Sequence, residues 1–309
     1  MANSVALIGE CMLELSRQPD MRPSGSLPMQ LAYGGDTLNF AVYLARQGTA
    51  VDYVTALGDD PLSDWMVEQW QGEGVGCDFV QREPGAVPGM YLIETDDEGE
   101  RSFFYWRDNA PARRLLDDEA RARALFAALD DHAYLGLSGI TLAILNDSSR
   151  QLLFELLSDY RSRGGKVVFD SNYRPALWPS VEATRSAYEA MYRLTDIALP
   201  TMEDEQAVFA DDDQGELILR LQSWGVNEVV LKMGELGCLV SDSAGLELVP
   251  ANVVTVVDTT SAGDSFNAGY LAARIQGKAP AEAAKAGHAV SSIVIQHRGA
   301  IIPVSAMPV

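Results

Sequence analysis

Short apolar runs rich in β-branched residues alternate with longer helix-like segments along most of the 309-residue chain. The runs show no alternation of polar and apolar residues, which is typical of strands buried on both faces. Strands of this kind with helices between them predict an α/β fold, in which helices cover both faces of a mostly parallel central sheet. Ligands in such folds bind beyond the carboxyl ends of the strands. We therefore expect a single domain over residues 1–309, with its site at that edge.

The same pattern predicts where the elements lie. Strands are expected at residues 5–8, 51–56, 133–137, 167–170, 196–199, 228–232 and 253–257. Helices are expected at about residues 36–48, 61–71, 118–129, 147–163, 181–194, 203–209, 215–224, 264–276 and 280–297. A hairpin is also expected at residues 237–250, turning at 243–245.

The segment GMYLIETDDEGERSFFYWR, residues 89–107, departs from this pattern and predicts another hairpin, turning at residues 96–99. Because strand side chains alternate between faces, both faces of its second arm carry large groups. One face holds Phe103, Tyr105 and Arg107, and the other holds Ser102, Phe104 and Trp106. Either one face covers a site while the other meets a partner subunit, or the segment is an ordinary edge hairpin of the main sheet.

Composition excludes several classes of protein. A net charge of −21 makes nucleic acids and anionic membranes poor partners. No apolar run approaches the length of a membrane span, and residues 1–10 lack the pattern of a signal peptide. The isolated thiols Cys11, Cys77 and Cys238 indicate a reducing cytoplasm and no zinc site. If the ligand is an anion, a few local Arg or Lys side chains must hold it.

The segment VVDTTSAGDSF, residues 256–266, predicts a buried strand, a loop of small residues and the start of a helix. Free amides and the helix dipole at such a junction favour an anion. Asp264 is itself an anion, so two interpretations remain open. Asp264 accepts a proton while the amides of residues 262–264 stabilise a transferring phosphoryl group. Alternatively, Asp264 is an ordinary first-turn acid and Ser261 an N-cap.

A second constellation is YGGDTLNFAVYLARQG, residues 33–48. Gly34 and Gly35 permit close backbone approach, and Asp36 and Asn39 offer groups suited to sugar hydroxyls. The alternative is that Asp36 only caps the helix that follows. The chain has neither a G-x-x-x-x-G-K-[ST] loop nor a G-x-G-x-x-G turn after a strand, which disfavours a P-loop kinase and a typical dinucleotide-binding dehydrogenase.

Together, GGDTLN and DTTSAGDSF resemble the ribokinase-like (PfkB) carbohydrate kinases over essentially the whole chain. Further segments are similar to the 2-keto-3-deoxygluconate kinases within that family: GECMLEL, YVTALGDDPLS, ETDDEGERSFFYWRDNAPAR, LSGITLAIL, DSNYRPALW and HRGAIIP. The resemblance implies a ribokinase-like sandwich with a small β lid from segments at about 10–33 and 89–107. It also implies transfer of a phosphoryl group from ATP, with Mg²⁺, to the 6-hydroxyl of a keto-sugar acid, by a homo-oligomer joined through the lid.

The resemblance also implies roles at matching positions. Asp264 corresponds to the catalytic base, and Ala262 and Gly263 with the amide of Asp264 correspond to the anion hole. The sugar-binding motif corresponds to Gly34, Gly35, Asp36 and Asn39. Residues that hold the keto-acid correspond to Tyr91, Tyr105, Arg107 and Arg174. Residues on the nucleotide side correspond to Asn172, Lys232, Gly234, Gly237 and Ser261.

Physical chemistry agrees with this assignment at Arg107 and Arg174, because arginine binds carboxylates with two parallel hydrogen bonds. For each arginine the alternative is a surface ion pair. Two functions compete with the implied one: a related kinase for a neutral sugar such as fructose or ribose, and a sugar sensor without catalysis. A neutral sugar would leave both cations unpaired.

Two departures from the family pattern stand out. Ser261 replaces the usual glycine. The N-x-x-E element, tied to magnesium and phosphate, corresponds only to MEDE, residues 202–205, with Met202 at the asparagine position. The implied metal residue is therefore Glu205, acting through a second shell, with Glu203 as the alternative.

Overall fold

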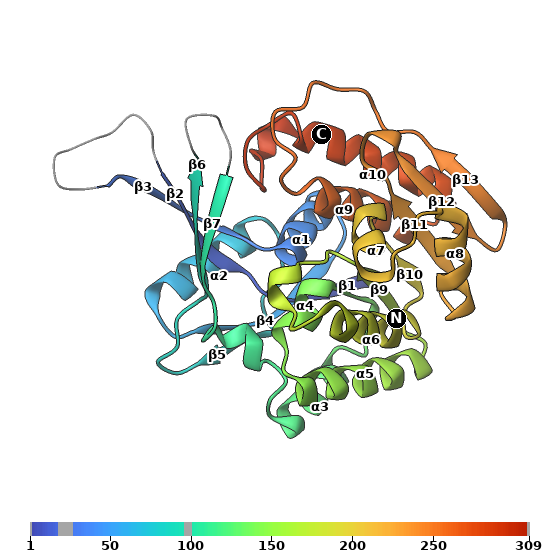
Figure 1. Ribbon diagram of the computed structural model, residues 1–309. Coiled ribbons are helices and arrows are strands. Elements are labelled where there is room, and N and C mark those ends of the chain that lie inside the picture. The colour runs from blue at the N-terminus through green and yellow to red at the C-terminus, as the bar shows by residue number, and fades with distance from the viewer. Residues whose placement is uncertain (1, 18–26, 96–100, 308–309) are drawn as a thin grey trace.

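The computed structural model describes residues 2–17, 27–95 and 101–307, and its centre is a nine-stranded sheet (Figure 1). The strand order is β13-β12-β11-β10-β9-β8-β1-β4-β5. All pairs from β11 to β5 are parallel, and the hairpin β12–β13 adds antiparallel strands at one edge. The strands are β1 (Ala2–Ile8), β4 (Val51–Gly58), β5 (Val80–Glu83), β8 (His132–Ser138), β9 (Lys166–Asp170), β10 (Ile197–Ala198), β11 (Glu228–Lys232), β12 (Cys238–Asp242) and β13 (Gly245–Val249).

Helices cover both faces of this sheet, as the continuous apolar strands predict (Figure 1). Alternate residues of one strand enter different cores: Leu7 packs with one helix layer and Ile8 with the other. The first layer is α1 (Asp36–Arg46), α2 (Pro61–Gly72), α9 (Ala262–Ile275) and α10 (Pro280–Val294). The second is α3 (Glu119–Ala128), α4 (Gly139–Ile144), α5 (Asp147–Ser162), α6 (Val181–Tyr192), α7 (Met202–Phe209) and α8 (Gln214–Ser223). Short 3-10 turns are η1 (Pro111–Arg114), η2 (Pro175–Leu177), η3 (Gly234–Leu236) and η4 (Val304–Ala306).

A separate four-stranded sheet, here called the small sheet, projects from one side of the molecule in the order β3-β2-β6-β7 (Figure 1). Its strands are β2 (Met12–Arg17), β3 (Met29–Gly34), β6 (Met90–Thr95) and β7 (Arg101–Trp106). The predicted hairpin is therefore β6–β7, with Tyr91 opposite Tyr105. It does not join the main sheet, which removes the edge-hairpin alternative. Its predicted turn at 96–99 lies outside the described residues.

Both faces of β7 carry large side chains, as predicted. The rings of Phe103 and Tyr105 stack on one face, with Tyr91 beside them. On the other face Phe104 and Trp106 are 48% and 56% exposed. The small sheet therefore presents an aromatic surface on each side.

One predicted strand is wrong. Residues 251–257 form no regular structure, and Val253 is fully exposed. The backbone amides of Val257 and Asp258 donate instead to the carbonyl of Ile295, just beyond the end of α10. A valine-rich run resembles a buried strand in residue type, but no neighbouring strand is available here to pair with it.

The other predicted strands and helices are confirmed to within a few residues, and so is the hairpin at 237–250. The residue pattern missed β2, β3, β5 and α4; the segment of β2 and β3 was expected only as part of the lid that the family resemblance implies. Within the described residues, no helix combines the length and apolar character needed to cross a membrane.

Candidate active site

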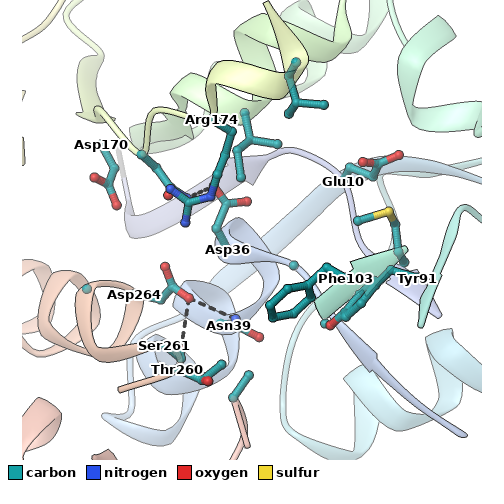
Figure 2. Close-up of a pocket in the computed structure, with 18 of the residues that line it drawn as sticks. Glu10, Asp36, Asn39, Tyr91, Phe103, Asp170, Arg174, Thr260, Ser261 and Asp264 are labelled. Atoms are coloured by element: carbon teal, nitrogen blue, oxygen red, sulfur yellow. Dashed lines mark hydrogen bonds between the residues drawn. The ribbon is translucent and has the colours of Figure 1, made fainter. Parts of the chain in front are cut away.

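A cavity of about 960 Å³ lies at the carboxyl ends of the parallel strands, between the small sheet and the start of α9 (Figure 2). The fold predicts a site at this edge, since loops after several strands meet there. The cavity brings together most residues that the sequence singled out. Those lining it are Gly34, Gly35, Asp36, Asn39, Tyr91, Tyr105, Arg107, Asn172, Arg174, Lys232, Ser261, Ala262, Gly263 and Asp264. Gly234, Gly237 and Glu205 do not line it.

Asp264 lies in the first turn of α9 and faces α1 across the cavity (Figure 2). Its Oδ2 accepts hydrogen bonds from Nδ2 of Asn39 at 2.9 Å and from Oγ of Ser261 at 3.0 Å. Burial, together with the nearby carboxylates of Asp36 and Asp170, raises the pKa of Asp264 to about 7. A carboxylate with this pKa can accept and return a proton near neutral pH.

Sequence analysis expected the amides of residues 262–264 to form an anion hole, and one of these three amides is already hydrogen-bonded. The backbone N–H of Ala262 donates to the carbonyl of Thr259 at 3.1 Å and is therefore occupied. No hydrogen bond within the described chain engages the N–H of Gly263 or Asp264. These two amides, at the N-terminus of a 14-residue helix, remain available for an anion.

The N-terminus of α1 forms the opposite wall. Gly35, not Asp36, occupies the N-cap position, which corrects the alternative that Asp36 caps this helix. Asp36 Oδ1 accepts from the amide of Thr37 at 2.8 Å, and Oδ2 accepts from the side chain of Asn172 at 2.6 Å. Burial raises the pKa of Asp36. Asn172 thus ties the loop after β9 to the start of α1.

Gly34 makes room for the small sheet. A Cβ atom at this position would overlap the hydroxyl oxygen of Tyr91. That hydroxyl donates to Oε2 of Glu14, so a side chain at position 34 would displace a hydrogen-bonded tyrosine. The close approach that the glycines permit is therefore to groups of the protein itself.

Three arginines border the cavity: Arg107, Arg113 and Arg174. Arg107 is buried and forms an ion pair with Glu10, in which Glu10 Oε1 has no hydrogen-bond partner among the described residues. Burial raises the pKa of Glu10 although Arg107 opposes the effect. Arg174 is exposed, donates through Nη1 to the carbonyl of Tyr173 at 2.8 Å, and extends toward the space above Asp264 (Figure 2).

Lys232, at the end of β11, is buried beneath residues 261–264, here called the anion loop. Its Nζ lies 3.0 Å from Oδ1 of Asp170 and 3.2 Å from Oδ1 of Asn267. Gly234 and Gly237 flank η3 just after it, and both have positive φ values, 57° and 101°. A Cβ at Gly237 would overlap the backbone of β13 and the following loop, so this glycine shapes the turn outside the cavity wall.

Glu205, the implied metal residue, lies outside the cavity wall. Its side chain is fully buried behind α7, where it accepts hydrogen bonds from Tyr192 and Arg220. Burial raises its pKa to about 7. The cavity wall instead holds Thr201 and Asp204, which keep the same three-residue spacing one position earlier along the chain.

Sequence reasoning also missed Glu10, Arg113 and Asp170. A usable signal was present for two of them, since Glu10 follows β1 and Asp170 ends β9. Polar residues directly at the carboxyl ends of parallel strands are site candidates in this fold. Arg113 lies in a 3-10 turn, and nothing in its local sequence distinguishes it from Arg114.

Known proteins support the assignment that the geometry suggests. Residues 2–307 match the model of the pfkB family carbohydrate kinases. The chain is 48% identical to the 2-dehydro-3-deoxygluconokinase of Escherichia coli strain K12, with 100% of both chains covered. It is 41% identical to that of Haemophilus influenzae, over 96% of this chain and 95% of the relative.

Solved structures agree on the fold. A 2-dehydro-3-deoxygluconokinase from Thermotoga maritima superposes with a TM-score of 0.83 at 22% identity, covering 97% of this chain and 95% of that one. A fructokinase with bound ATP from Xylella fastidiosa superposes with a TM-score of 0.82 at 23% identity, covering 100% and 96%. The family resemblance found in the sequence is confirmed: the chain belongs to the pfkB family of carbohydrate kinases.

Proposed function

We propose that the protein transfers the γ-phosphoryl group of ATP to the 6-hydroxyl of 2-keto-3-deoxygluconate, the substrate also called 2-dehydro-3-deoxygluconate. The observation that carries this proposal is the group of arginines at the cavity, which stand there beside several carboxylates. Three arginines, Arg107, Arg113 and Arg174, border one cavity in a chain whose net charge is −21. A sugar acid and the phosphates of ATP would use these cations. A neutral sugar would offer no carboxylate to Arg113 or Arg174, whereas Arg107 already pairs with Glu10.

Asp264 is the proposed general base. Because Asn39 and Ser261 both donate to Oδ2, Oδ1 remains to accept the proton of the 6-hydroxyl. As the hydroxyl oxygen bonds to the γ-phosphorus, the bond from phosphorus to the bridging oxygen breaks and ADP leaves. The free amides of Gly263 and Asp264 stabilise the negative charge on the transferring group.

Lys232 lies where it can support the phosphates. A Cβ atom at Gly263 would be 3.6 Å from its Nζ, so the ammonium group lies directly beneath the anion loop. We assign Gly234, Gly237 and Asn172 to the nucleotide side on the family resemblance; Asn172 lines the cavity, whereas Gly234 and Gly237 lie outside its wall. Arg174 extends toward the space above Asp264, where it could contact either substrate (Figure 2).

Magnesium fits a site that offers few protein ligands. The described residues hold no cluster of three or more His, Cys, Asp or Glu side chains able to bind a metal. Mg²⁺ commonly keeps several waters and binds through one or two carboxylates plus substrate phosphates. Asp204, whose Oδ2 accepts from Ser171 at 2.7 Å, is the cavity carboxylate that would hold it, directly or through water. The ion would neutralise phosphate charge there.

The small sheet is the proposed lid. Tyr91, Phe103 and Tyr105 line the cavity from its inner face, where they would exclude water that could otherwise hydrolyse ATP. Its outer face carries Leu31, Phe104 and Trp106, all at least 39% exposed. We infer that this apolar face pairs with a second copy of the chain to form a homodimer.

We expect the protein to act in the cytoplasm, since Cys11, Cys77 and Cys238 are all free thiols. The nearest competing function is a pfkB kinase for a neutral sugar, and the more distant one is a sensor that binds sugar without turnover.

The deciding experiment measures ADP release with ATP and Mg²⁺ in the presence of 2-keto-3-deoxygluconate, fructose or ribose, and identifies the phosphorylated product. We expect kcat/KM to be highest with the keto-acid and the product to be its 6-phosphate. Higher kcat/KM with fructose or ribose would replace the substrate assignment. Binding of the keto-acid in calorimetry without ADP release would support the sensor.

A further inference from the structure

We propose that Ser261 is a positioning residue for Asp264: its hydroxyl holds Oδ2 of the carboxylate, which leaves Oδ1 directed at the sugar hydroxyl. This inference rests on the proposed role of Asp264 as general base. The hydrogen bond from Ser261 Oγ to Asp264 Oδ2 is 3.0 Å long, and the one from Asn39 Nδ2 to the same oxygen is 2.9 Å. Two donors on one oxygen fix the rotation of the carboxylate.

The backbone of Ser261 is arranged for this contact. Its φ and ψ are 62° and 16°, a left-handed conformation that L-residues other than Asn and Asp rarely adopt. Only two other non-glycine residues in the described ranges have positive φ, Asn172 and Ala210. Strained conformations of this kind persist where the surrounding structure requires them, often at functional sites.

Other helices of the same chain show what a serine or threonine does without this constraint. Ser138, Ser180 and Thr201 are N-caps of α4, α6 and α7, and all three have extended backbones. Each accepts a hydrogen bond from an amide in the first turn of its helix. Ser261 stands at the N-cap of α9 but makes no such bond. Its hydroxyl donates to a carboxylate instead, so the amides of the anion loop stay free.

The charges around Asp264 show why a second donor matters. Asp36 from α1 and Asp170 from β9 face it and raise its pKa together with burial. Asn39 and Ser261 lower that pKa by donating to the charged form. The cations Lys232 and Arg174 border the same cavity, and Tyr43 of α1 lies within electrostatic reach. Without the Ser261 hydroxyl, the carboxylate would be harder to ionise and freer to rotate.

The test compares kcat and kcat/KM across pH for the native enzyme, Ser261→Ala and Ser261→Gly. Both substitutions remove the hydroxyl, but only glycine also relieves the left-handed strain. We expect kcat to fall by roughly 10-fold in both and the acidic limb of the pH profile to move up by about 0.5–1 pH unit. KM for ATP should change less than kcat, because the free amides remain.

Ala210→Gly is the matched control. Ala210 has almost the same backbone conformation, with φ 61° and ψ 32°, at the C-cap of α7 outside the cavity. Relief of strain should raise Tm by about 1–2 °C in Ala210→Gly and in Ser261→Gly. Only the Ser261 variants should shift the pH profile.

Two results would overturn the inference while leaving the base assignment intact, provided that Asp264→Asn is inactive. One is a Ser261→Ala profile that superposes on the native one. The other is a loss of kcat in both Ser261 variants with no movement of the acidic limb, which would indicate only a structural role. Native-like activity in Asp264→Asn would remove the base assignment, and the inference with it.

Discussion

The side-chain amide of Asn39 donates a 2.9 Å hydrogen bond to Asp264, although 225 positions separate the two residues. Asn39 lies in α1 and Asp264 in α9, and these two helices pack side by side on one face of the main sheet. The motif that resembles a sugar-binding segment and the motif that resembles a phosphate-binding loop are therefore two walls of one cavity. Asn39 Oδ1 is buried without a partner within the described chain, which suits a sugar hydroxyl as donor.

The pKa of Asp264, about 7, predicts the pH dependence of catalysis. A general base must be ionised, so kcat/KM should rise with pH and level off above about 7. Asp264→Asn should lower kcat by roughly 10²-fold or more. Steady-state ADP release between pH 5.5 and 9 measures both. A profile with no inflection between pH 6 and 8 would contradict the assignment.

The same pKa predicts a stability effect of opposite sign. The folded pKa of Asp264 lies above its unfolded value near 3.8, so the folded state binds more protons between these values and its stability declines as pH rises from about 4 to 7. Asp264→Asn removes the free-energy cost of ionising this buried carboxyl group in the folded state. Its Tm should exceed the native Tm by about 2–4 °C at pH 8, with a smaller difference at pH 4.5, as measured by thermal unfolding. Equal differences at both pH values would argue against a raised pKa.

Gly34→Ala should weaken sugar binding because the new methyl group must displace Tyr91 and its hydrogen bond to Glu14. We expect KM for the keto-acid to rise by about 10-fold or more. Gly72→Ala is the control, since no atom lies within 4 Å of a Cβ there and its φ is ordinary. That variant should keep its KM. An unchanged KM in Gly34→Ala would mean that Tyr91 does not contact the substrate.

Arg107→Met should destabilise the fold by roughly 3–5 kcal/mol, because it leaves the buried carboxylate of Glu10 without its cation. Adding Glu10→Gln to that variant removes the uncompensated charge and should recover much of the loss in Tm. The double variant should nevertheless keep a raised KM for 2-keto-3-deoxygluconate. If KM also returned to the native value, Arg107 would serve only to neutralise Glu10.

Asp204 and Glu205 are adjacent in sequence but differ in their surroundings, so they should respond differently to magnesium. Asp204→Asn should raise the Mg²⁺ concentration for half-maximal activity by about 10-fold, since Asp204 lines the cavity. Glu205→Gln should leave that concentration unchanged, because the side chain is fully buried against Arg220. Magnesium titrations of ADP release decide between them. The reverse pattern would restore Glu205 as the metal residue.

Trp106→Glu should convert the proposed dimer to a monomer, because it places a charge on the outer apolar face of the small sheet. Leu248→Glu is the matched control: Leu248 is 58% exposed, much like Trp106 at 56%, but lies on β13. Light scattering coupled to gel filtration gives the mass of each variant. A native protein that elutes as a monomer would contradict the proposal directly.

Local residue patterns predicted the elements that are buried along their whole length. Strands such as Glu228–Lys232 are fully buried, and their residue types alone indicate this. The run at 253–257 is even richer in β-branched residues and forms no strand, because pairing depends on a neighbouring strand that local sequence does not specify. Family resemblance added the cavity residues by position. At the metal element, which departs from the usual pattern, the residue that lines the cavity is Asp204, one position before the matching Glu205.

The sequence by itself determined the fold class, the family and most of the residues that meet in the cavity, since burial patterns and motif spacing are written in residue types. Only the tertiary structure decided how those residues are paired. The ion pair of Arg107 with Glu10, the occupied amide of Ala262 and the contact of Ser261 with Asp264 each depend on distances and backbone angles. Such quantities arise when segments distant along the chain pack together, so they cannot be read from any one segment.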